Sequence, residues 1–390
     1  MSLLHTIRFS LSSLAQSIKR PARLRALESF VKEEIAYIGQ MPRNTGARRG
    51  TIVVKCDDIG DLFMWQQVIP FIVENAEKPL YFVTTSVNRP LIEHFFDFAD
   101  GYIYIDKSRW GDKAYRQQQY QAVHSLKANM AFTPLFTRNL KMDDLLVLAS
   151  DAARRVAWDM RHHAYFPSFK FKQPVTTDTI TSDKPIELEY FRNIEFIEKL
   201  YNISLPHVIS PMFPSFGKQN RLVVVPVSNA PSKCWAPALF ADVIKAVSPQ
   251  FDSVLLLGGP NSVAACKFIE EKCGLPKLIN LAGETQLHEL VPFIGESRLL
   301  LCADTFALHV AVQTSTDLVL VSNGTNWQRF SNYAPYVSSQ VQVVYPDFFH
   351  ERPEKQKLVY SRSEINTIAP EKVIKAIKTC LSRSAKDQRA

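Results

Sequence analysis

The chain has 390 residues, 46% of them hydrophobic, and 46 Lys and Arg against 38 Asp and Glu give a net charge of +8. This length exceeds one usual domain, and the composition is that of a soluble globular protein, so two domains with substantial cores are expected. The positive charge suits an acidic ligand or an anionic membrane surface, but over such a length it is also ordinary.

The cysteines exclude two further classes of protein. They show no Cys-x-x-Cys pair and no spacing typical of metal ligands, and several fall inside predicted buried strands or helices. A reducing cytosol is the simplest compartment, so we expect neither a disulfide scaffold nor a zinc module. The six are Cys56, Cys234, Cys266, Cys273, Cys302 and Cys380.

Residues 1–47 read as an amphipathic and basic extension. Apolar residues recur at helical spacing from Leu3 to Ile18, and Pro21 separates this stretch from a second helix over 22–37. The segment is too polar to span a bilayer. Two interpretations remain, a helix lying on an anionic membrane surface or one packed on the main domain or a partner, and packing is preferred. Deletion of residues 1–45 is therefore expected to leave a folded protein.

The main fold is predicted to begin at Thr51 with a β-branched strand, followed by a turn at Ile59-Gly60-Asp61 and a helix. Further strands are expected over 81–86 and 101–106, and a helix over 113–124. The run from Leu145 to Asp159 is expected to supply a later strand and turn. Arg154 and Arg155 suit an anionic acceptor, although pairing with Asp or Glu is the commoner role.

Three segments lead towards a second domain. The basic and aromatic stretch 162–174 is typical of a loop that faces a glycan. A helix is expected over 186–201, and the Pro- and Ser-rich stretch 204–220 is a candidate hinge.

The second half carries four short apolar runs that read as buried strands of a parallel sheet, over 221–227, 253–257, 299–302 and 318–321. Small or polar residues follow the first three. Because ligands of open α/β sheets bind outside the carboxyl ends of the strands, these residues should converge on one edge. The free N–H groups where a helix starts there favour an anion, so a nucleotide diphosphate is the fitting ligand. The residues are Ser228, Lys233, Gly258, Gly259, Asp304 and Thr305.

Each signal also has a plainer explanation. Asp304 suits the N-cap of the helix that carries His309, Asp61 suits a first-turn carboxylate favoured by the helix dipole, and an isolated Lys233 is more often a solvated surface lysine. Their shared position at strand ends favours a site.

The order of four motifs is similar to that of the ADP-heptose:lipopolysaccharide heptosyltransferases, family nine of the glycosyltransferases. A strand that ends in Lys55 is followed by Gly60-Asp61 at a helix start. SKCWAPALFADVI resembles the Lys-x-Trp-Pro motif, LLLGGP the Gly-Gly-Pro turn, and LAGETQLHELVPFIGESRLLLCADTFALHVA the block that ends in Asp-Thr-Gly-x-x-His. The resemblance covers roughly residues 50–385.

The resemblance implies a GT-B architecture, an α/β fold with two Rossmann-like domains whose parallel sheets face each other across a cleft. It places an acceptor-binding domain at 48–205 and a nucleotide-sugar-binding domain at 206–365. The remaining segments are the extension 1–47 and a C-terminal helix, 366–390, that returns to the N-terminal domain.

The resemblance also implies residue roles. Asp61 becomes the catalytic base, and the donor nucleotide sugar is bound by Gly60, Ser228, Lys233, Gly258, Gly259, Asp304, Thr305 and His309. Transfer would invert the sugar, from a donor such as ADP-heptose, onto a lipopolysaccharide core or related anionic glycolipid or glycan. No metal, further cofactor or nucleic acid is expected, and the protein would be cytoplasmic, with peripheral contact at the inner membrane.

Two departures leave alternatives open. The family's Asp-Thr-Gly is Asp304-Thr305-Phe306 here, and the missing Gly is the residue that would let the backbone approach a phosphate closely. The acidic residue that often follows the Gly-Gly turn in the family is also absent. A catalytically inactive nucleotide-sugar-binding or scaffold protein is the main rival. A nucleotide-dependent oxidoreductase is disfavoured because no Gly-x-Gly-x-x-Gly loop follows the first strand.

Overall fold

The computed structural model describes residues 25–159, 175–182, 184, 187–213, 216–325, 327–350 and 365–387. The chain forms two compact units. The first comprises Met1–Asp57, Val73–Ser86 and Ala99–Asp183, and the second comprises Asp58–Ile72, Val87–Phe98 and Lys184–Ala390. The predicted glycan-facing stretch 162–174 lies outside the described residues.

The first unit is built on a six-stranded sheet in the order β3-β2-β1-β4-β5-β6, with every neighbouring pair parallel. The central strands are apolar on both faces, as a parallel sheet covered on both sides requires. The predicted strands at 51, 81–86 and 101–106 are confirmed. The strands are β1 (Thr51–Lys55), β2 (Leu80–Thr85), β3 (Gly101–Ile105), β4 (Met130–Thr133), β5 (Arg154–Trp158) and β6 (Asp178–Ile180).

Three helical segments cover one face of this sheet: residues 25–39, α5 (Lys113–His124) and α6 (Asp143–Ala149). The strand predicted at the start of the run from Leu145 to Asp159 is wrong. The apolar residues at the start of this run belong to helix α6, and the strand of this run is β5. A short apolar run suits either structure, and here the first-turn carboxylates of α6 suit a helix N-terminus.

The N-terminal helix is part of this core. Val31 and Ile38 are buried among residues of α5, α6 and the sheet, and Glu34 forms a buried ion pair with Arg116 at 2.9 Å between Oε1 and Nη2. The second helix expected over 22–37 is thus found at 25–39, packed on the first unit. Residues 1–24, on which the membrane interpretation depends, lie outside the described residues.

Removal of residues 1–45 is therefore expected to destabilise the first unit, contrary to the sequence-based expectation. Loss of the buried side chains of Val31 and Ile38 alone should lower the free energy of unfolding by about 3–6 kcal/mol. Urea unfolding of this truncation, against one lacking only residues 1–24, checks the point. Equal unfolding midpoints for the two truncations would contradict it.

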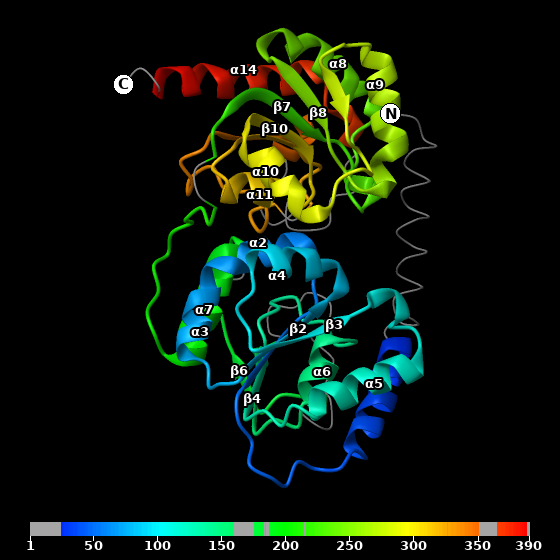
Figure 1. The fold of residues 1–390 in the computed structure, drawn as a ribbon, viewed down its shortest axis with the longest axis vertical. Helices are drawn as coiled ribbons and strands as arrows, with labels where there is room; N and C mark the ends of the chain where they lie inside the picture. Colours follow the sequence, from blue (N-terminus) through cyan, green and yellow to red (C-terminus); the bar gives the residue numbers. More distant parts are fainter. Residues whose placement is uncertain are drawn as a thin grey trace. The chain divides into compact units, whose positions relative to one another are not determined.

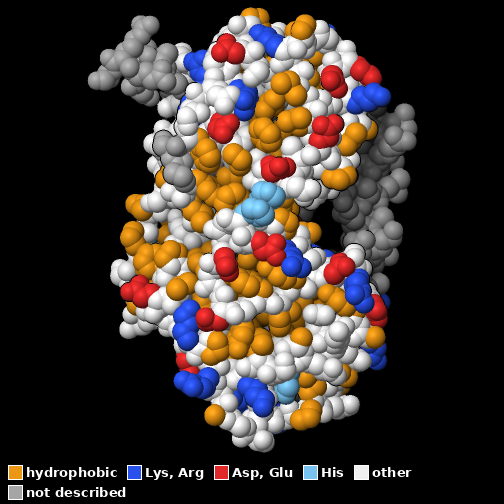
Figure 2. All heavy atoms as spheres, viewed as in Figure 1, with side chains coloured by type: hydrophobic (Ala, Val, Ile, Leu, Met, Phe, Trp, Pro, Cys, Tyr) orange, Lys and Arg blue, Asp and Glu red, His pale blue; other side chains and the backbone are white. Residues whose placement is uncertain are grey.

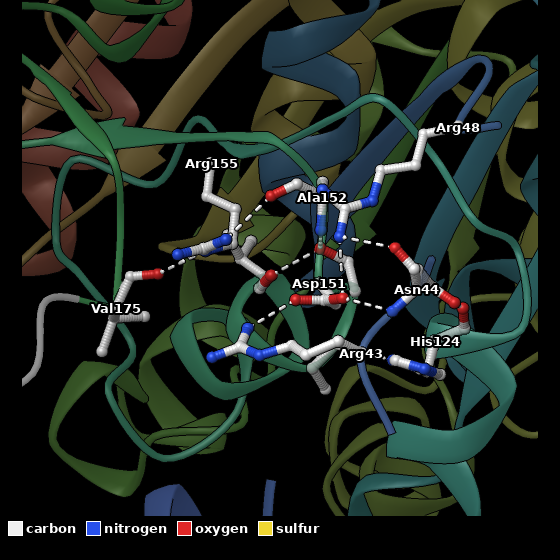
Figure 3. Close-up of polar contacts among 11 residues, drawn as sticks. Arg43, Asn44, Arg48, His124, Asp151, Ala152, Arg155 and Val175 are labelled. Atoms are coloured by element: carbon white, nitrogen blue, oxygen red, sulfur yellow. Dashed lines mark hydrogen bonds and ion pairs between the residues drawn. The ribbon is translucent and has the colours of Figure 1, made fainter. Parts of the chain in front are cut away.

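Asp151 ties the segment that follows this helix to the sheet. Its carboxylate accepts hydrogen bonds from Arg43 Nη1 at 2.6 Å, Arg48 Nη2 at 2.9 Å and the backbone N–H of Asn44 at 2.8 Å (Figure 3). Burial alone would raise the pKa of Asp151, but these donors outweigh burial and hold the pKa below its ordinary value. The contact fixes residues 43–48 against the turn that precedes β5.

The neighbouring arginines have structural partners. Arg155 donates to the backbone carbonyls of Ala152 at 2.7 Å and Val175 at 3.1 Å, and Arg154 lies 3.7 Å from the carboxylate of Asp178 (Figure 3 shows Arg155). These contacts favour the plainer interpretation of both arginines over an acceptor site.

The Asp151→Asn variant is expected to be less stable than the parent by about 1.5–3 kcal/mol at pH 7, because charge-assisted hydrogen bonds are lost. Since the folded-state pKa is depressed, this contribution is present above the unfolded-state value of about 3.9 and vanishes as the pH falls through the folded pKa. Urea unfolding at pH 7 and near pH 2 measures the difference. Asp178→Asn, which breaks an exposed pair, is the control and should change stability little.

The second unit contains the other six-stranded sheet, in the order β12-β11-β10-β7-β8-β9, again parallel throughout. The four apolar runs predicted as strands are confirmed. The strands are β7 (Gln219–Val225), β8 (Ser253–Leu256), β9 (Leu278–Asn280), β10 (Ser297–Ala303), β11 (Asp317–Val321) and β12 (Val341–Val344).

Helices cover both faces of this sheet (Figure 1). The core on one face lies under α8 (Pro237–Val247), α9 (Val263–Cys273) and α14 (Pro370–Asp387), and α10 (Leu290–Gly295) and α11 (Ala307–Gln313) contact the other face. Helix α14 contacts α8, β11 and β12 through an apolar stripe that includes Val373 and Ile377. Its return to the N-terminal domain stays a prediction.

The second unit also contains helices from the first part of the chain. Helix α2 (Ile59–Trp65) contacts both α7 (Glu189–Tyr201) and α11. Each unit is therefore built from three separate segments of the chain, whereas a single boundary at residue 205 was predicted. The other α-helices of the described residues are α3 (Ile69–Asn75), α4 (Arg89–Phe95) and α12 (Asp347–His350).

Charged side chains of both signs are interspersed over the face drawn in Figure 2. On this face the Lys and Arg side chains do not gather into one basic surface. Among the described residues, no helix combines the length and apolarity needed to cross a membrane.

Candidate active site

The strand order of the second sheet defines one preferred place for a ligand. From β7 the chain proceeds outward through β8 and β9, then returns to form β10 beside β7 and proceeds outward the other way. A crevice outside the carboxyl ends of the strands forms where the order reverses, and ligands of such sheets bind there. The segments that follow β7 and β10 carry Lys233 and Asp304.

Lys233 and Asp304 form an ion pair across this reversal point, with 3.0 Å between Nζ and Oδ2. Lys233 ends the short helix η4 (Pro231–Lys233), and Asn323 steadies that turn by donating to the carbonyl of Ser232 at 2.8 Å. Burial raises the pKa of Asp304, and Lys233 partly opposes this. An ammonium has three N–H donors, so the pair orients Lys233 while leaving donors for an anion.

The other predicted donor-site residues lie at the same edge. The backbone N–H of Ser228 donates to Cys234 Sγ at 3.3 Å, which closes the turn after β7. At Gly258 a Cβ atom would lie 2.5 Å from the side chain of Ser262, so the turn after β8 accepts only glycine there. At Gly259 the nearest atom to such a Cβ is 3.5 Å away, so glycine is not required.

Helix α2 brings Gly60 and Asp61 to the start of α11. A Cβ on Gly60 would lie 2.7 Å from Cδ2 of His309, so this close approach of the two helices requires glycine. Asp61 stands in the first turn of α2, whose N-cap residue Asp58 makes no side-chain capping bond. The first-turn placement suits an ionised carboxylate.

His309 is buried and electrically neutral. Its Nδ1 lies 2.7 Å from the hydroxyl of Tyr333, itself fully buried. Burial, assisted by the charge of Lys233, lowers the pKa of His309 to about 3. Burial raises the pKa of Tyr333 well above its ordinary value, with smaller contributions from Tyr190 and Asp61. Tyr333 was not predicted, because it lies in an irregular segment without a motif.

These residues form one constellation, with a carboxylate on α2, a neutral imidazole on α11 and an ammonium–carboxylate pair at the sheet edge. The family model described as glycosyltransferase family 9 (heptosyltransferase) matches residues 149–358, more than half of the chain. The chain belongs to glycosyltransferase family 9. It is therefore a glycosyltransferase, as the sequence predicted, and the oxidoreductase alternative is wrong.

Solved structures show the same fold. The ADP-heptose LPS heptosyltransferase II of E. coli is 18% identical with a TM-score of 0.60, over 86% of this chain and 99% of that one. A family 9 glycosyltransferase from Veillonella parvula is 15% identical with a TM-score of 0.63, over 85% and 97%. The E. coli heptosyltransferase WaaC with ADP is 12% identical with a TM-score of 0.62, over 84% and 99%. The predicted GT-B fold class is confirmed. A comparison with the curated proteins finds no match.

Phe306, the departure from the family's Asp-Thr-Gly, is accommodated in this glycosyltransferase without backbone strain. It stands before α11 with φ of −55° and ψ of −26°, a right-handed conformation open to every residue. Phe306, and not Asp304, is the N-cap residue of α11, so the plainer explanation of Asp304 does not hold. The adjacent Thr305 is partly exposed.

A buried network, also not predicted, joins α2 to α11. Gln66 Nε2 donates to Gln313 Oε1 at 2.7 Å, and the same oxygen accepts from the backbone N–H of Met212 at 2.9 Å. The Gln313 amide also donates to the hydroxyl of Tyr190, which in turn bonds to the carbonyl of Phe63 at 3.1 Å. The C-terminal part of the helix that carries Asp61 is thus tied to the helix that follows Asp304.

Among the described residues, no three His, Cys, Asp or Glu side chains gather closely enough to hold a metal ion. The expectation that transfer needs neither a metal nor a cofactor stays a prediction.

Proposed function

We propose that this glycosyltransferase moves heptose from ADP-heptose to a saccharide acceptor of the lipopolysaccharide core or a related anionic glycolipid, with inversion at the anomeric carbon. The donor class is supported by the family description and by two proteins of the same fold, an ADP-heptose LPS heptosyltransferase and a heptosyltransferase solved with ADP. The observation that carries the proposal is the Lys233–Asp304 pair at the reversal point of the second sheet. A glycolipid acceptor would be met at the cytoplasmic face of the inner membrane.

The reaction follows from the chemistry of these groups. The carboxylate of Asp61 takes the proton of the acceptor hydroxyl as its oxygen forms a bond to the anomeric carbon. The bond from that carbon to the phosphate oxygen breaks on the opposite side, which inverts the configuration, and the electron pair leaves with the nucleotide diphosphate. The ammonium of Lys233 stabilises the charge that develops there.

Asp304 serves this step by orienting Lys233. A buried carboxylate next to a diphosphate would repel it, but paired with Lys233 it fixes the ammonium at one place, and transition-state stabilisation depends on such preorganisation. No step in the proposal passes through a metal or cofactor, and dialysis against a chelator should leave the rate unchanged.

A panel of nucleotide sugars tests the donor. We expect hydrolysis in the absence of acceptor, and transfer to truncated lipopolysaccharide cores, to be fastest with ADP-heptose. The anomeric configuration of the product, read by NMR, tests inversion. Faster turnover of a sugar carried by another nucleotide would overturn the donor assignment, and a product of retained configuration would overturn the direct displacement.

A further inference from the structure

Tyr333 and His309 contact each other, and neither side chain has a role in the reaction proposed above. Both side chains are buried, with relative exposures of 0% and 5%, and their polar atoms lie 2.7 Å apart. A buried imidazole can carry its single proton on either ring nitrogen, and the bond made by the other nitrogen decides which.

The direction of this bond can be assigned from the partners available. The phenol stays protonated, since burial raises the pKa of Tyr333 well above its ordinary value. A buried O–H needs an acceptor, and among the described residues Nδ1 of His309 is the only hydrogen-bond partner recorded for this hydroxyl. If Nδ1 carried the proton, the phenol hydrogen would have no acceptor. Tyr333 therefore donates to Nδ1, and the proton of the neutral ring resides on Nε2.

The Nε2–H group points towards the candidate site. A Cβ built on Gly60 would lie 3.2 Å from Nε2 and 3.5 Å from Cα of Phe306, so this nitrogen lies where the first turns of α2 and α11 meet. In the part of the chain that the structure describes, Nε2 makes no hydrogen bond to another residue. It is not among the fully buried polar atoms that lack a partner, so a bound ligand can reach this donor.

We infer that Tyr333 is a positioning residue that fixes His309 as the Nε2–H tautomer, so that His309 donates a hydrogen bond to an oxygen of the bound nucleotide diphosphate sugar. This inference rests on the proposed function for the identity of the ligand but not for the tautomer. A phosphate oxygen and a sugar oxygen offer the same acceptor chemistry, and the binding experiments below distinguish them.

The tautomer is measured on the free protein labelled with ¹⁵N-histidine. The chain has nine histidines, and the signals of His309 are assigned by their disappearance in His309→Gln. In the parent protein at neutral pH we expect a protonated Nε2 and an unprotonated Nδ1. A protonated Nδ1 in the parent would overturn the inference, whatever the variants do.

Tyr333→Phe removes only the hydroxyl. We expect the His309 signals to shift to those of a mixture of tautomers, and unchanged signals would show that Tyr333 does not fix the ring. Tyr345→Phe is the matched control, since it removes a buried hydroxyl of the same unit, bonded to Ser331 at 3.2 Å, without touching His309. It should leave the His309 signals unchanged.

Kinetics and calorimetry test the ligand. With Tyr333→Phe we expect roughly a two- to tenfold loss, the effect of weakening one hydrogen bond, in the affinity for the donor or in kcat. Weaker binding of both ADP and ADP-heptose would assign the contact to a phosphate oxygen. A loss confined to ADP-heptose would assign it to the sugar. Parental affinities and kcat would overturn the ligand contact, and failure of every nucleotide sugar to react would overturn the proposed function while the tautomer result stands.

Discussion

Substitution of Asp61→Asn is expected to lower the rate of sugar transfer by about a hundredfold to ten-thousandfold, the usual cost of removing a general base. Asparagine keeps the shape of the side chain in the first turn of α2 but cannot accept the proton of the acceptor hydroxyl. Donor affinity and melting temperature should stay close to those of the parent. Steady-state transfer, donor calorimetry and thermal unfolding of the same preparation measure the three quantities.

A matched control lies three residues earlier. Asp58→Asn removes the same charge from the N-cap position of the same helix, where the side chain makes no capping bond, and should retain most of the transfer rate. If Asp61→Asn transferred sugar at the parental rate, Asp61 would be only a first-turn charge that favours the helix dipole.

Lys233→Met is expected to weaken the binding of ADP by roughly tenfold to a hundredfold. A charge-assisted hydrogen bond contributes about 1.5–3 kcal/mol, and each 1.4 kcal/mol is a factor of about ten in affinity. The variant also leaves the carboxylate of Asp304, only 7% exposed, without the ammonium that offsets its burial. Calorimetry with ADP measures the loss, and kcat for transfer should fall with it.

Lys272→Met supplies the comparison. Lys272 makes an ion pair with Asp242 at 2.7 Å, in the last turn of α9, a helix of the same unit. Its loss should leave ADP binding unchanged. Combining Lys233→Met with Asp304→Asn tests whether the two residues act as a pair, because the double variant should then lose less than the sum of the single losses. Unchanged ADP affinity in Lys233→Met would remove this residue from the site.

The fold was largely predictable because a parallel sheet covered on both faces demands strands that are apolar throughout. The runs that became β7, β10 and β11 are visible in the sequence for that reason. The edge of the second sheet was predictable too. The carboxyl ends of parallel strands all lie at the same edge of a sheet. Lys233 and Asp304 follow two such ends, so both were expected at that edge.

Other features depend on contacts that local sequence does not encode. The run LLVLA became a helix because short apolar runs fit either structure until their neighbours are fixed. Tyr333 and Gln313 act through side chains brought together from distant segments, and neither belongs to a motif. The last helix has an apolar stripe that predicts a buried face, but the stripe does not say against which sheet it packs.

The attachment of α2 to α7 and α11 has a consequence for recombining members of the family. Residues 58–72 precede most of the first sheet in the chain, yet they pack with the second unit through the contact of Gly60 with His309 and the bond between Gln66 and Gln313. A chimaera that joins the first half of one enzyme to the second half of another at residue 205 would separate these partners. The first unit is better exchanged as three pieces, with residues 58–72 and 87–98 inherited together with the rest of the second unit, so that Asp61, Lys233 and Asp304 come from the same parent.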